Sequence, residues 1–136
     1  TSSFTMTGGV IGKIIEENDT SKSSWEYAAT ETNHSNYASK GGGGIYVASG
    51  DVTINGGKIS YNYVPNPGND CGGNAPSNTA CGGGISVVKG NLTINNAEVS
   101  YNSGYQGGGI RCYNNNSNAG TLTLNKTLIK GNTSNP

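Results

Sequence analysis

The sequence predicts an all-β fold, a parallel β-helix solenoid with three short strands per coil. Two observations predict it: a glycine-rich motif returns along the chain, and the same two strand-like segments follow each copy. The composition agrees, because 32% of the 136 residues are hydrophobic and 23 are glycines, whereas globular chains are about 45–50% apolar. Disorder would favour a high net charge, yet 8 basic residues balance 8 acidic ones. We therefore expect a thin, repetitive core.

The repeat begins with three glycines and an isoleucine. Copies of this motif lie at 42–45, 82–85 and 107–110. Glycine suits sharp corners that need a positive φ angle or a close backbone approach between coils. The motif opens a strand with alternating sides, in which Ile45 and Val47 point inward and Tyr46 points outward.

Two further strands complete each unit. The second strands are Val52-Thr53-Ile54-Asn55, Leu92-Thr93-Ile94-Asn95 and Leu122-Thr123-Leu124-Asn125. The third strands are Ile59-Ser60-Tyr61-Asn62, Val99-Ser100-Tyr101-Asn102 and Ile129-Lys130-Gly131-Asn132. Near the N-terminus, Phe4-Thr5-Met6-Thr7 matches the second strand and Val10-Ile11 matches the third.

Successive units must stack, because one unit has too few inward apolar side chains to bury them alone. A spacing of about 4.8 Å then aligns equivalent residues in ladders. We expect aliphatic ladders inside, threonines outside, and asparagines at a bend, where amide groups bond from coil to coil. The outer ladder is Thr5, Thr53, Thr93 and Thr123, and the bend ladder is Asn62, Asn102 and Asn132. The rule for parallel crossovers favours a right-handed helix.

Extra residues must leave the solenoid as loops, because successive glycine motifs are 40 and 25 residues apart. We place insertions at 15–41 and 63–81, where the sequence is polar and aperiodic. Both follow a third strand and precede a glycine motif, so we expect both at one corner, where solenoids place binding surfaces. Residues 1–136 are expected to form a single β-helix segment of a longer solenoid or fibre.

The glycine motif and the third strands together resemble the repeats of polymorphic outer membrane proteins, which are bacterial surface adhesins. In that family a Gly-Gly-aliphatic tetrapeptide alternates with Phe-x-x-Asn. The first element matches at 43–45, 83–85 and 108–110. The second keeps the three bend asparagines, but Ile59, Val99 and Ile129 stand where the family has Phe. The resemblance covers about 42–132 and implies a secreted, surface-attached and non-enzymatic protein.

The three cysteines predict one disulfide. Cys71 and Cys81 bracket the second insertion, and a bond between them would add about 2–3 kcal/mol in the chain-entropy model. Cys112 occupies the inward position of Val47 and Val87, so we expect a small buried hydrophobe there. A single histidine and no Cys-x-x-Cys motif disfavour zinc, and we predict no metal and no cofactor.

Sequons for N-glycosylation occur in strands and in loops. They are at Asn18, Asn33, Asn91, Asn115, Asn125 and Asn132. In a secreted eukaryotic protein, the loop sequons Asn18, Asn33 and Asn115 are good glycan sites, whereas in a bacterial protein the sequons carry little meaning. Both interpretations stay open.

Several outward aromatic residues are candidates for contact with sugars or another protein. They are Tyr46, Tyr63, Tyr105 and Tyr113, with Trp25 in the first insertion. The alternative is that these tyrosines simply suit a half-buried pleated surface. The outer threonines also suggest ice binding as an alternative function. The neighbouring rank of Ser3, Asp51, Asn91 and Thr121 is irregular and partly charged, which disfavours it.

Charge and sequence pattern disfavour several other functions. A net charge of zero gives no basic stripe for nucleic acid, and no apolar run reaches the ~18 residues of a membrane span. A polysaccharide lyase or hydrolase would need clustered carboxylates, but Asp51, Asp70 and Glu98 lie on different elements. We predict no catalytic residues.

The leading hypothesis is a structural or adhesive module of an extracellular or cell-surface protein or fibre. Its expected partners are further solenoid repeats, copies of itself stacked end to end, or surface glycans and cell-surface proteins. The beginning of the chain lacks an initiator Met and a signal pattern, so we expect a mature protein or a segment of a larger one. A polysaccharide-acting enzyme and an ice-binding solenoid are the alternatives.

Overall fold

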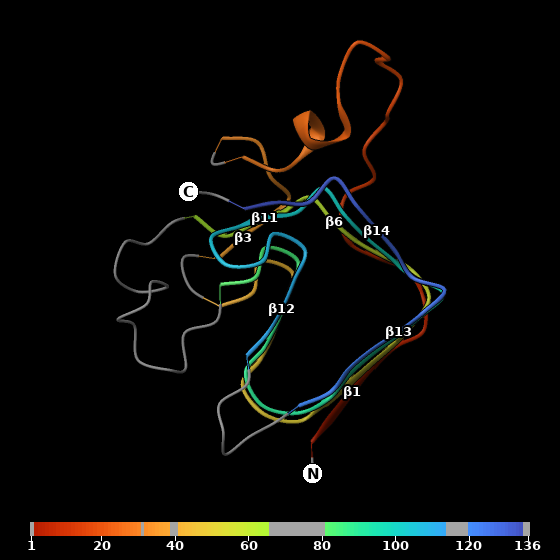
Figure 1. Cartoon of the computed structure of the whole chain (residues 1–136), viewed down its shortest axis with the longest axis vertical. Helices are drawn as coiled ribbons and strands as arrows, with labels where there is room; N and C mark the ends of the chain where they lie inside the picture. The colour runs from red at the N-terminus through yellow and green to blue at the C-terminus, as the bar shows by residue number, and fades with distance from the viewer. Residues whose placement is uncertain (1, 31, 39–40, 66–80, 114–119, 135–136) are drawn as a thin grey trace.

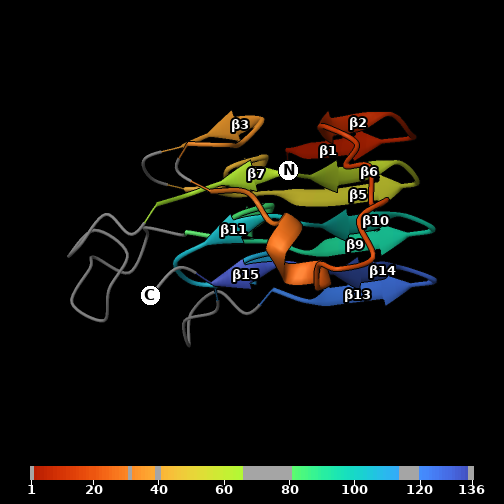
Figure 2. The same ribbon diagram turned by 90° about the horizontal axis from the view of Figure 1, so that it is seen from above.

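The computed structural model describes residues 2–30, 32–38, 41–65, 81–113 and 120–134, except the side chains of Ser24 and Trp25. The described chain is a parallel β-helix of stacked coils, as the sequence predicts (Figure 1). Strands of successive coils lie one above another (Figure 2), and every pairing between named strands is parallel. Short strands suffice here, because each strand pairs along its length with the coils beside it.

Four sheets form the walls. Sheet 1 contains β1 (Ser3–Met6), β5 (Asp51–Asn55), β9 (Leu92–Asn95) and β13 (Leu122–Asn125). Sheet 2 contains β2 (Val10–Gly12), β6 (Lys58–Ser60), β10 (Glu98–Ser100) and β14 (Leu128–Lys130). Sheet 3 contains β3 (Asn36–Tyr37), β7 (Asn62–Tyr63), β11 (Ser103–Gly104) and β15 (Thr133–Ser134). Sheet 4 contains β4 (Ile45–Val47), β8 (Ile85–Val87) and β12 (Ile110–Cys112).

Sheet 3 corrects the prediction of three strands per coil. Its strands have two residues each, too few to show the alternation that marks a strand in a sequence. The first insertion leaves after β2 and rejoins the solenoid at β3, while the second follows β7. The insertions therefore leave from two places, not from one corner.

The strand register confirms the predicted ladders. Thr5, Thr53, Thr93 and Thr123 are paired in sequence across sheet 1. Ile85 lies between Ile45 and Ile110 in sheet 4. The inward side chains of the middle coils form one apolar core, which includes Val52, Ile54, Ile59, Ile85, Leu92, Ile94 and Val99.

Close approach between coils explains the triple glycines. A Cβ atom on Gly44 would lie 2.8 Å from the Gly84 carbonyl oxygen, and one on Gly84 would lie 2.6 Å from that of Gly109. A left-handed backbone occurs in one of the motifs, at Gly107 (φ 85°), and also at the bend between sheets 2 and 3, where Tyr61 (φ 63°), Tyr101 (φ 56°) and Gly131 (φ 60°) occupy equivalent positions. Tyrosine is unusual at such a φ angle.

The first insertion crosses the outside of the stack. We call residues 13–30 the strap; it contains the short 3₁₀ helix η1 (Ser24–Tyr27) and runs from the first coil toward the last (Figure 2). The Ala29 amide donates to the Tyr101 carbonyl (2.9 Å), and Glu17 pairs with Lys130 in the last coil. The strap thus links coils far apart in sequence.

Candidate interaction surfaces

The two ends of the stack expose apolar side chains that equivalent positions bury in the middle. Ile59, Val99 and Ile129 share one register position in sheet 2. The first two are fully buried, whereas Ile129 is 45% exposed. Phe4 is likewise 44% exposed while its neighbour Val52 is buried. Leu122 and Leu124 are also exposed at the C-terminal end, although their register partners Leu92 and Ile94 are fully buried.

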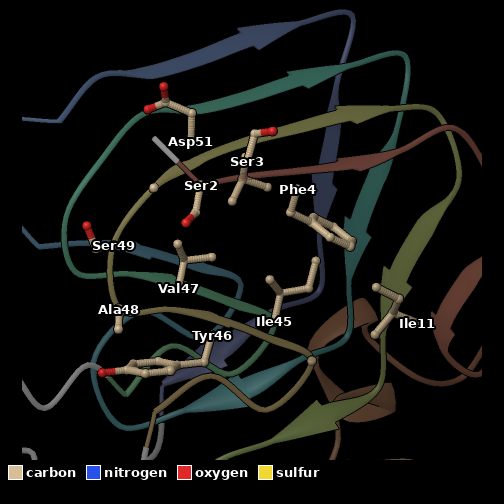
Figure 3. A pocket seen from close by; sticks show the side chains of 13 residues that line it. Ser2, Ser3, Phe4, Ile11, Ile45, Tyr46, Val47, Ala48, Ser49 and Asp51 are labelled. Atoms are coloured by element: carbon tan, nitrogen blue, oxygen red, sulfur yellow. The ribbon is translucent and has the colours of Figure 1, made fainter.

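A cavity of about 500 Å³ opens at the N-terminal end, between β1 and β4. Phe4, Ile45 and Val47 point into the coil there (Figure 3). Ser3, Ser49 and Asp51 border the cavity, but their side chains point away from the coil interior (Figure 3). The side chains that point into the cavity are therefore mainly apolar, as is usual for a binding site.

The asparagine ladder at the bend between sheets 2 and 3 is continuous. The Asn62 side-chain amide donates to Asn102 Oδ1 (2.8 Å), and that of Asn102 donates to Asn132 Oδ1 (2.9 Å). Each amide also donates to a backbone carbonyl one coil before, as Asn102 does to Ile59 (3.0 Å). Asn36 extends the ladder into the first insertion by donating to Asn62 Oδ1 (2.6 Å). The buried amide groups of Asn62 and Asn102 are thereby satisfied.

A second ladder lies exposed on the outer face of sheet 1. The Asn95 amide donates to Asn55 (2.8 Å) and the Asn125 amide donates to Asn95 (2.7 Å). On the other side of the threonine rank, Asn91 donates to Asp51 through its backbone and side chain, both at 2.9 Å. The outer face is therefore lined by threonines and by ordered polar ranks.

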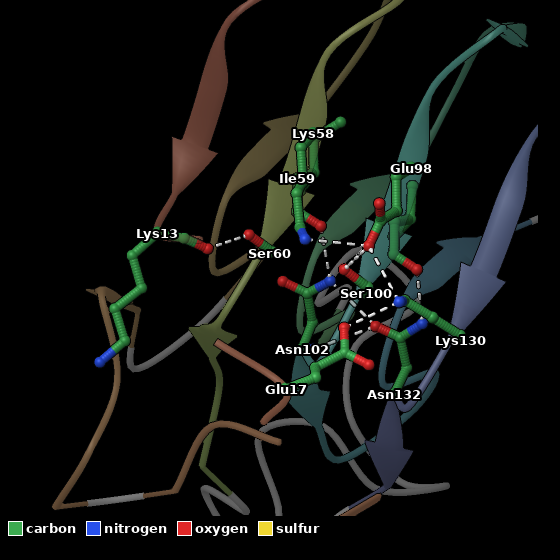
Figure 4. A network of polar contacts seen from close by, with 11 residues as sticks. Lys13, Glu17, Lys58, Ile59, Ser60, Glu98, Ser100, Asn102, Lys130 and Asn132 are labelled. Atoms are coloured by element: carbon green, nitrogen blue, oxygen red, sulfur yellow. Dashed lines mark hydrogen bonds and ion pairs between the residues drawn. The ribbon is translucent and has the colours of Figure 1, made fainter. Parts of the chain in front are cut away.

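Charged side chains of the outer face of sheet 2 form a network with the strap (Figure 4). Lys130 Nζ lies 2.8 Å from Glu17 and 3.9 Å from Glu98, and Lys58 Nζ lies 3.0 Å from Glu98. The hydrogen bond from Lys130 lowers the pKa of the Glu17 carboxyl. Burial acts to raise the pKa of Glu98, but hydrogen bonds from Ser100 and Lys58 outweigh it and leave that pKa lowered.

Aromatic rings lie beneath the strap. Tyr61, Tyr63 and Tyr101 form a buried cluster with Ala29, and Lys13 Nζ lies 3.9 Å from the centre of the Tyr61 ring. Burial raises the pKa of both Tyr61 and Tyr101. Tyr61 and Tyr101 were not predicted as surface or site residues, although a tyrosine directly precedes the ladder asparagines Asn62 and Asn102.

The predicted contact aromatics lie on different elements. Tyr46 in β4 is exposed, and Tyr105 and Tyr113 are partly exposed. Tyr63 is buried, with His34 stacked on it (5.7 Å between ring centres) and Tyr37 nearby. The first insertion covers Tyr63, so the prediction that its ring faces outward is wrong. The Trp25 side chain is outside the described residues.

The prediction that Cys112 is buried is wrong. Cys112 is free and exposed, although β12 pairs with β8 in the predicted register. β12 is an edge strand of sheet 4, so no further strand of the described chain covers it. Cys81 is buried beside Val64, but Cys71 lies outside the described residues, and the Cys71–Cys81 disulfide stays a prediction.

The sequons differ in accessibility. Asn18, Asn33, Asn91 and Asn125 are exposed, while Asn115 is outside the described residues. Asn132 is half-buried, and its amide nitrogen donates to the Val99 carbonyl (2.8 Å). A glycan on Asn132 would crowd the bend ladder, and one on Asn91 or Asn125 would use an amide that donates to Asp51 or Asn95 on the outer face.

Comparison with known proteins adds no family. No protein-family model, curated protein or solved structure matches this chain. Within the described ranges, no three His, Cys, Asp or Glu side chains gather in a way that could hold a metal ion. No helix in that part of the chain is long and apolar enough to cross a membrane.

Proposed function

We propose that this chain is a non-enzymatic structural or adhesive module of an extracellular surface protein or fibre, and that its ends stack against further solenoid coils. The observation that carries the proposal is the exposure of core-type side chains at both ends, Phe4 at one and Leu124 and Ile129 at the other. Open solenoid ends and their edge strands favour pairing with another strand or a capping repeat.

The ends are suited to each other. β1 and β13 are the two edge strands of sheet 1, and β2 and β14 are those of sheet 2. A copy added end to end would place Leu122 and Leu124 over Phe4 and Met6 in the register that sheet 1 already uses. Parallel in-register pairing of this kind continues ladders of identical or similar side chains. The resemblance to polymorphic outer membrane protein repeats supports a surface location.

Sedimentation velocity of the whole chain over a range of concentrations tests the stacking. We expect the wild type to associate, and Leu124→Lys to remain monomeric because it places a charge on the apolar end. Thr123→Lys is the matched control, since Thr123 belongs to the outer ladder of the same strand, and it should associate like the wild type. A wild type that stays monomeric at high concentration would contradict the proposal.

An adhesive role is tested separately. We expect the immobilised chain to retain glycans on an array or cells in a binding assay, with the outer faces as the contact surface. Hydrolysis or eliminative cleavage of a polysaccharide by the purified chain would replace this function with an enzymatic one. A chain that associates but binds neither glycans nor cells would be structural rather than adhesive.

One observation favours a second candidate, an ice-binding solenoid. The outer face of sheet 1 aligns Thr5, Thr53, Thr93 and Thr123 across its strands, and parallel strands repeat every 4.7–4.9 Å or so. Such a rank of hydroxyl and methyl groups can order water. Thermal hysteresis of a chain solution is the test, and its loss in Thr93→Tyr would assign the activity to this face.

A further inference from the structure

The cavity at the N-terminal end lies where a fourth strand of sheet 4 would be. In the described part of the chain, sheet 4 has three strands where each other sheet has four. β4 is its edge strand on this side, and the cavity lies over β4, bounded by β1 and by Ile11 of β2. The space therefore continues the stack that β4, β8 and β12 already form.

We infer that this cavity is a docking slot for an extended peptide strand of the pattern Gly-aliphatic-x-aliphatic, which adds to β4 in parallel. The inference deepens the proposed function, because it names the kind of segment that one end of the solenoid accepts. Addition of a strand to an open sheet edge combines main-chain hydrogen bonds with pockets for alternate side chains.

The aliphatic ladders of sheet 4 predict the two aliphatic positions of the docked strand. Ile45 lies on Ile85 and Val47 lies on Val87, and in β8, which has strands on both sides, these positions are fully buried. A strand on β4 would place two aliphatic side chains over Ile45 and Val47, beside Phe4. Phe4 is 44% exposed when no strand is docked. The docked strand would therefore contact apolar side chains both below it, in β4, and beside it, at Phe4.

The main-chain bonds also follow from the stack. The Gly84 carbonyl accepts from the Ile45 amide (2.9 Å), and the Gly109 carbonyl accepts from the Ile85 amide (2.8 Å). The Gly44 carbonyl is the next member of this series. It would accept from the amide of the first aliphatic residue of the docked strand.

The glycine requirement is the most specific feature. A Cβ atom on Gly44 would meet the Gly84 carbonyl oxygen at 2.8 Å, and one on Gly84 would meet that of Gly109 at 2.6 Å. Real Cβ atoms essentially never approach within 3.0 Å. The residue before the first aliphatic position of the docked strand must therefore be glycine, since any side chain there would strike the Gly44 carbonyl.

Fluorescence anisotropy with a labelled peptide tests the slot. The peptide Gly-Gly-Gly-Ile-Ser-Val-Val, the sequence of residues 82–88, is titrated with the full chain. We expect saturable one-to-one binding, weakened about tenfold or more when alanine replaces the third glycine, because overpacking at a rigid backbone is unfavourable. A peptide with serine at both aliphatic positions should also fail to bind.

Two chain variants locate the site. Val47→Arg should abolish binding by filling the slot, and circular dichroism should show whether the variant is folded. If it is not, a cross-link replaces it. In Tyr46→Cys with Cys112→Ser, a peptide carrying cysteine at the position of Ser86 should form a disulfide when dissolved oxygen oxidises the two thiols, since Tyr46 and Ser86 are paired neighbours. Thr53→Cys with Cys112→Ser is the control that should not cross-link.

The outcomes separate this inference from the proposed function. Peptide binding by the Leu124→Lys chain, whose altered residue lies at the opposite end, supports the slot even where the wild type does not stack. Stacking without peptide binding overturns the slot and leaves the proposed function. Equal binding of the alanine peptide, or of decanoate or a glycan at the same site, overturns the strand as occupant and shows a general apolar cavity.

Discussion

The middle and end coils of this solenoid carry the same sequence pattern but differ in what they bury. Val99 in the third coil and Ile129 in the fourth share a register position, yet one is fully buried and the other is 45% exposed. The chemical type of the two residues is nearly identical. Burial in this fold is therefore set by the number of stacked neighbours, and the repeat pattern alone does not determine it.

The bends and the flat outer face differ in the same way. The ladder of Asn62, Asn102 and Asn132 is closed in by the coils, and Asn62 and Asn102 are fully buried. The ladder of Asn55, Asn95 and Asn125 has the same amide-to-amide bonds but faces solvent. Hydrogen bonds of equal length should thus contribute unequally, because water can replace only the exposed ones.

The largest effect should come from a charge in a middle coil. Val99→Asp would bury an unpaired carboxylate and lower the free energy of unfolding by about 4 kcal/mol, while Ile129→Asp should cost about 1 kcal/mol or less, since its side chain reaches water. Urea denaturation of both variants measures this under conditions that keep the chain monomeric. Equal losses would show that the end coil is covered in solution.

The next effect should come from the buried ladder. Asn102→Ala removes the acceptor of two Asn62 donors and the donor to the Ile59 carbonyl, so we expect a loss of about 2–3 kcal/mol. Asn95→Ala is the matched control from the exposed ladder of the same coil and should lose under about 1 kcal/mol. Urea denaturation again decides. A control variant as unstable as Asn102→Ala would remove the distinction between the ladders.

A smaller, pH-dependent effect should appear in the strap. Because Lys130 lowers the pKa of Glu17 below its ordinary value of 4.5, the charged carboxylate favours the docked strap. This contribution is present above about pH 4.5 and is lost as the pH falls through the lowered pKa. It is modest, since Glu17 is partly exposed and solvent screens the pair.

Hydrogen exchange of the Ala29 amide, which donates to the Tyr101 carbonyl, measures the docking of the strap. After correction for intrinsic rates, we expect faster exchange in acid for the wild type. Glu17→Gln should exchange faster already at neutral pH and show a weaker pH dependence. A wild type whose exchange is unchanged in acid would mean that the aromatic cluster alone holds the strap.

The sequence was sufficient for the features that repeat. The register of Thr5, Thr53 and Thr93, the inward stack of Ile85 and the bend asparagines all follow from aligning the units, because stacking forces equivalent residues together. Features without a recognisable sequence pattern were missed. The two-residue strands of sheet 3 are too short for a pattern, and the path of the strap depends on contacts such as that between Glu17 and Lys130, which are distant in sequence.

The predictions for Cys112 and Tyr63 were wrong because the burial of both side chains depends on neighbouring segments. Cys112 was expected inside because Val47 and Val87 are its counterparts, but inward direction gives burial only when a strand lies on both sides. Tyr63 was predicted as an outward contact residue, but the first insertion returns beside it and stacks His34 on its ring. Both depend on neighbours that the local sequence does not specify.

The smallest effect is expected on the outer face of sheet 1, where middle and end coils should behave alike. Thr93 and Thr123 are paired on the outer face of sheet 1, one in the third coil and one in the fourth, and both are half-buried. Outward side chains are not covered by the next coil in the way that inward ones are, so Thr93→Ala and Thr123→Ala should each cost under about 1 kcal/mol. The two losses should agree within about 0.5 kcal/mol, whereas the inward pair Val99→Asp and Ile129→Asp should differ severalfold. Urea denaturation of these four variants measures both differences at once. An outer pair that differs as much as the inward pair would mean that the fourth coil is frayed as a whole, and that exposure of its end is not the cause of the asymmetry.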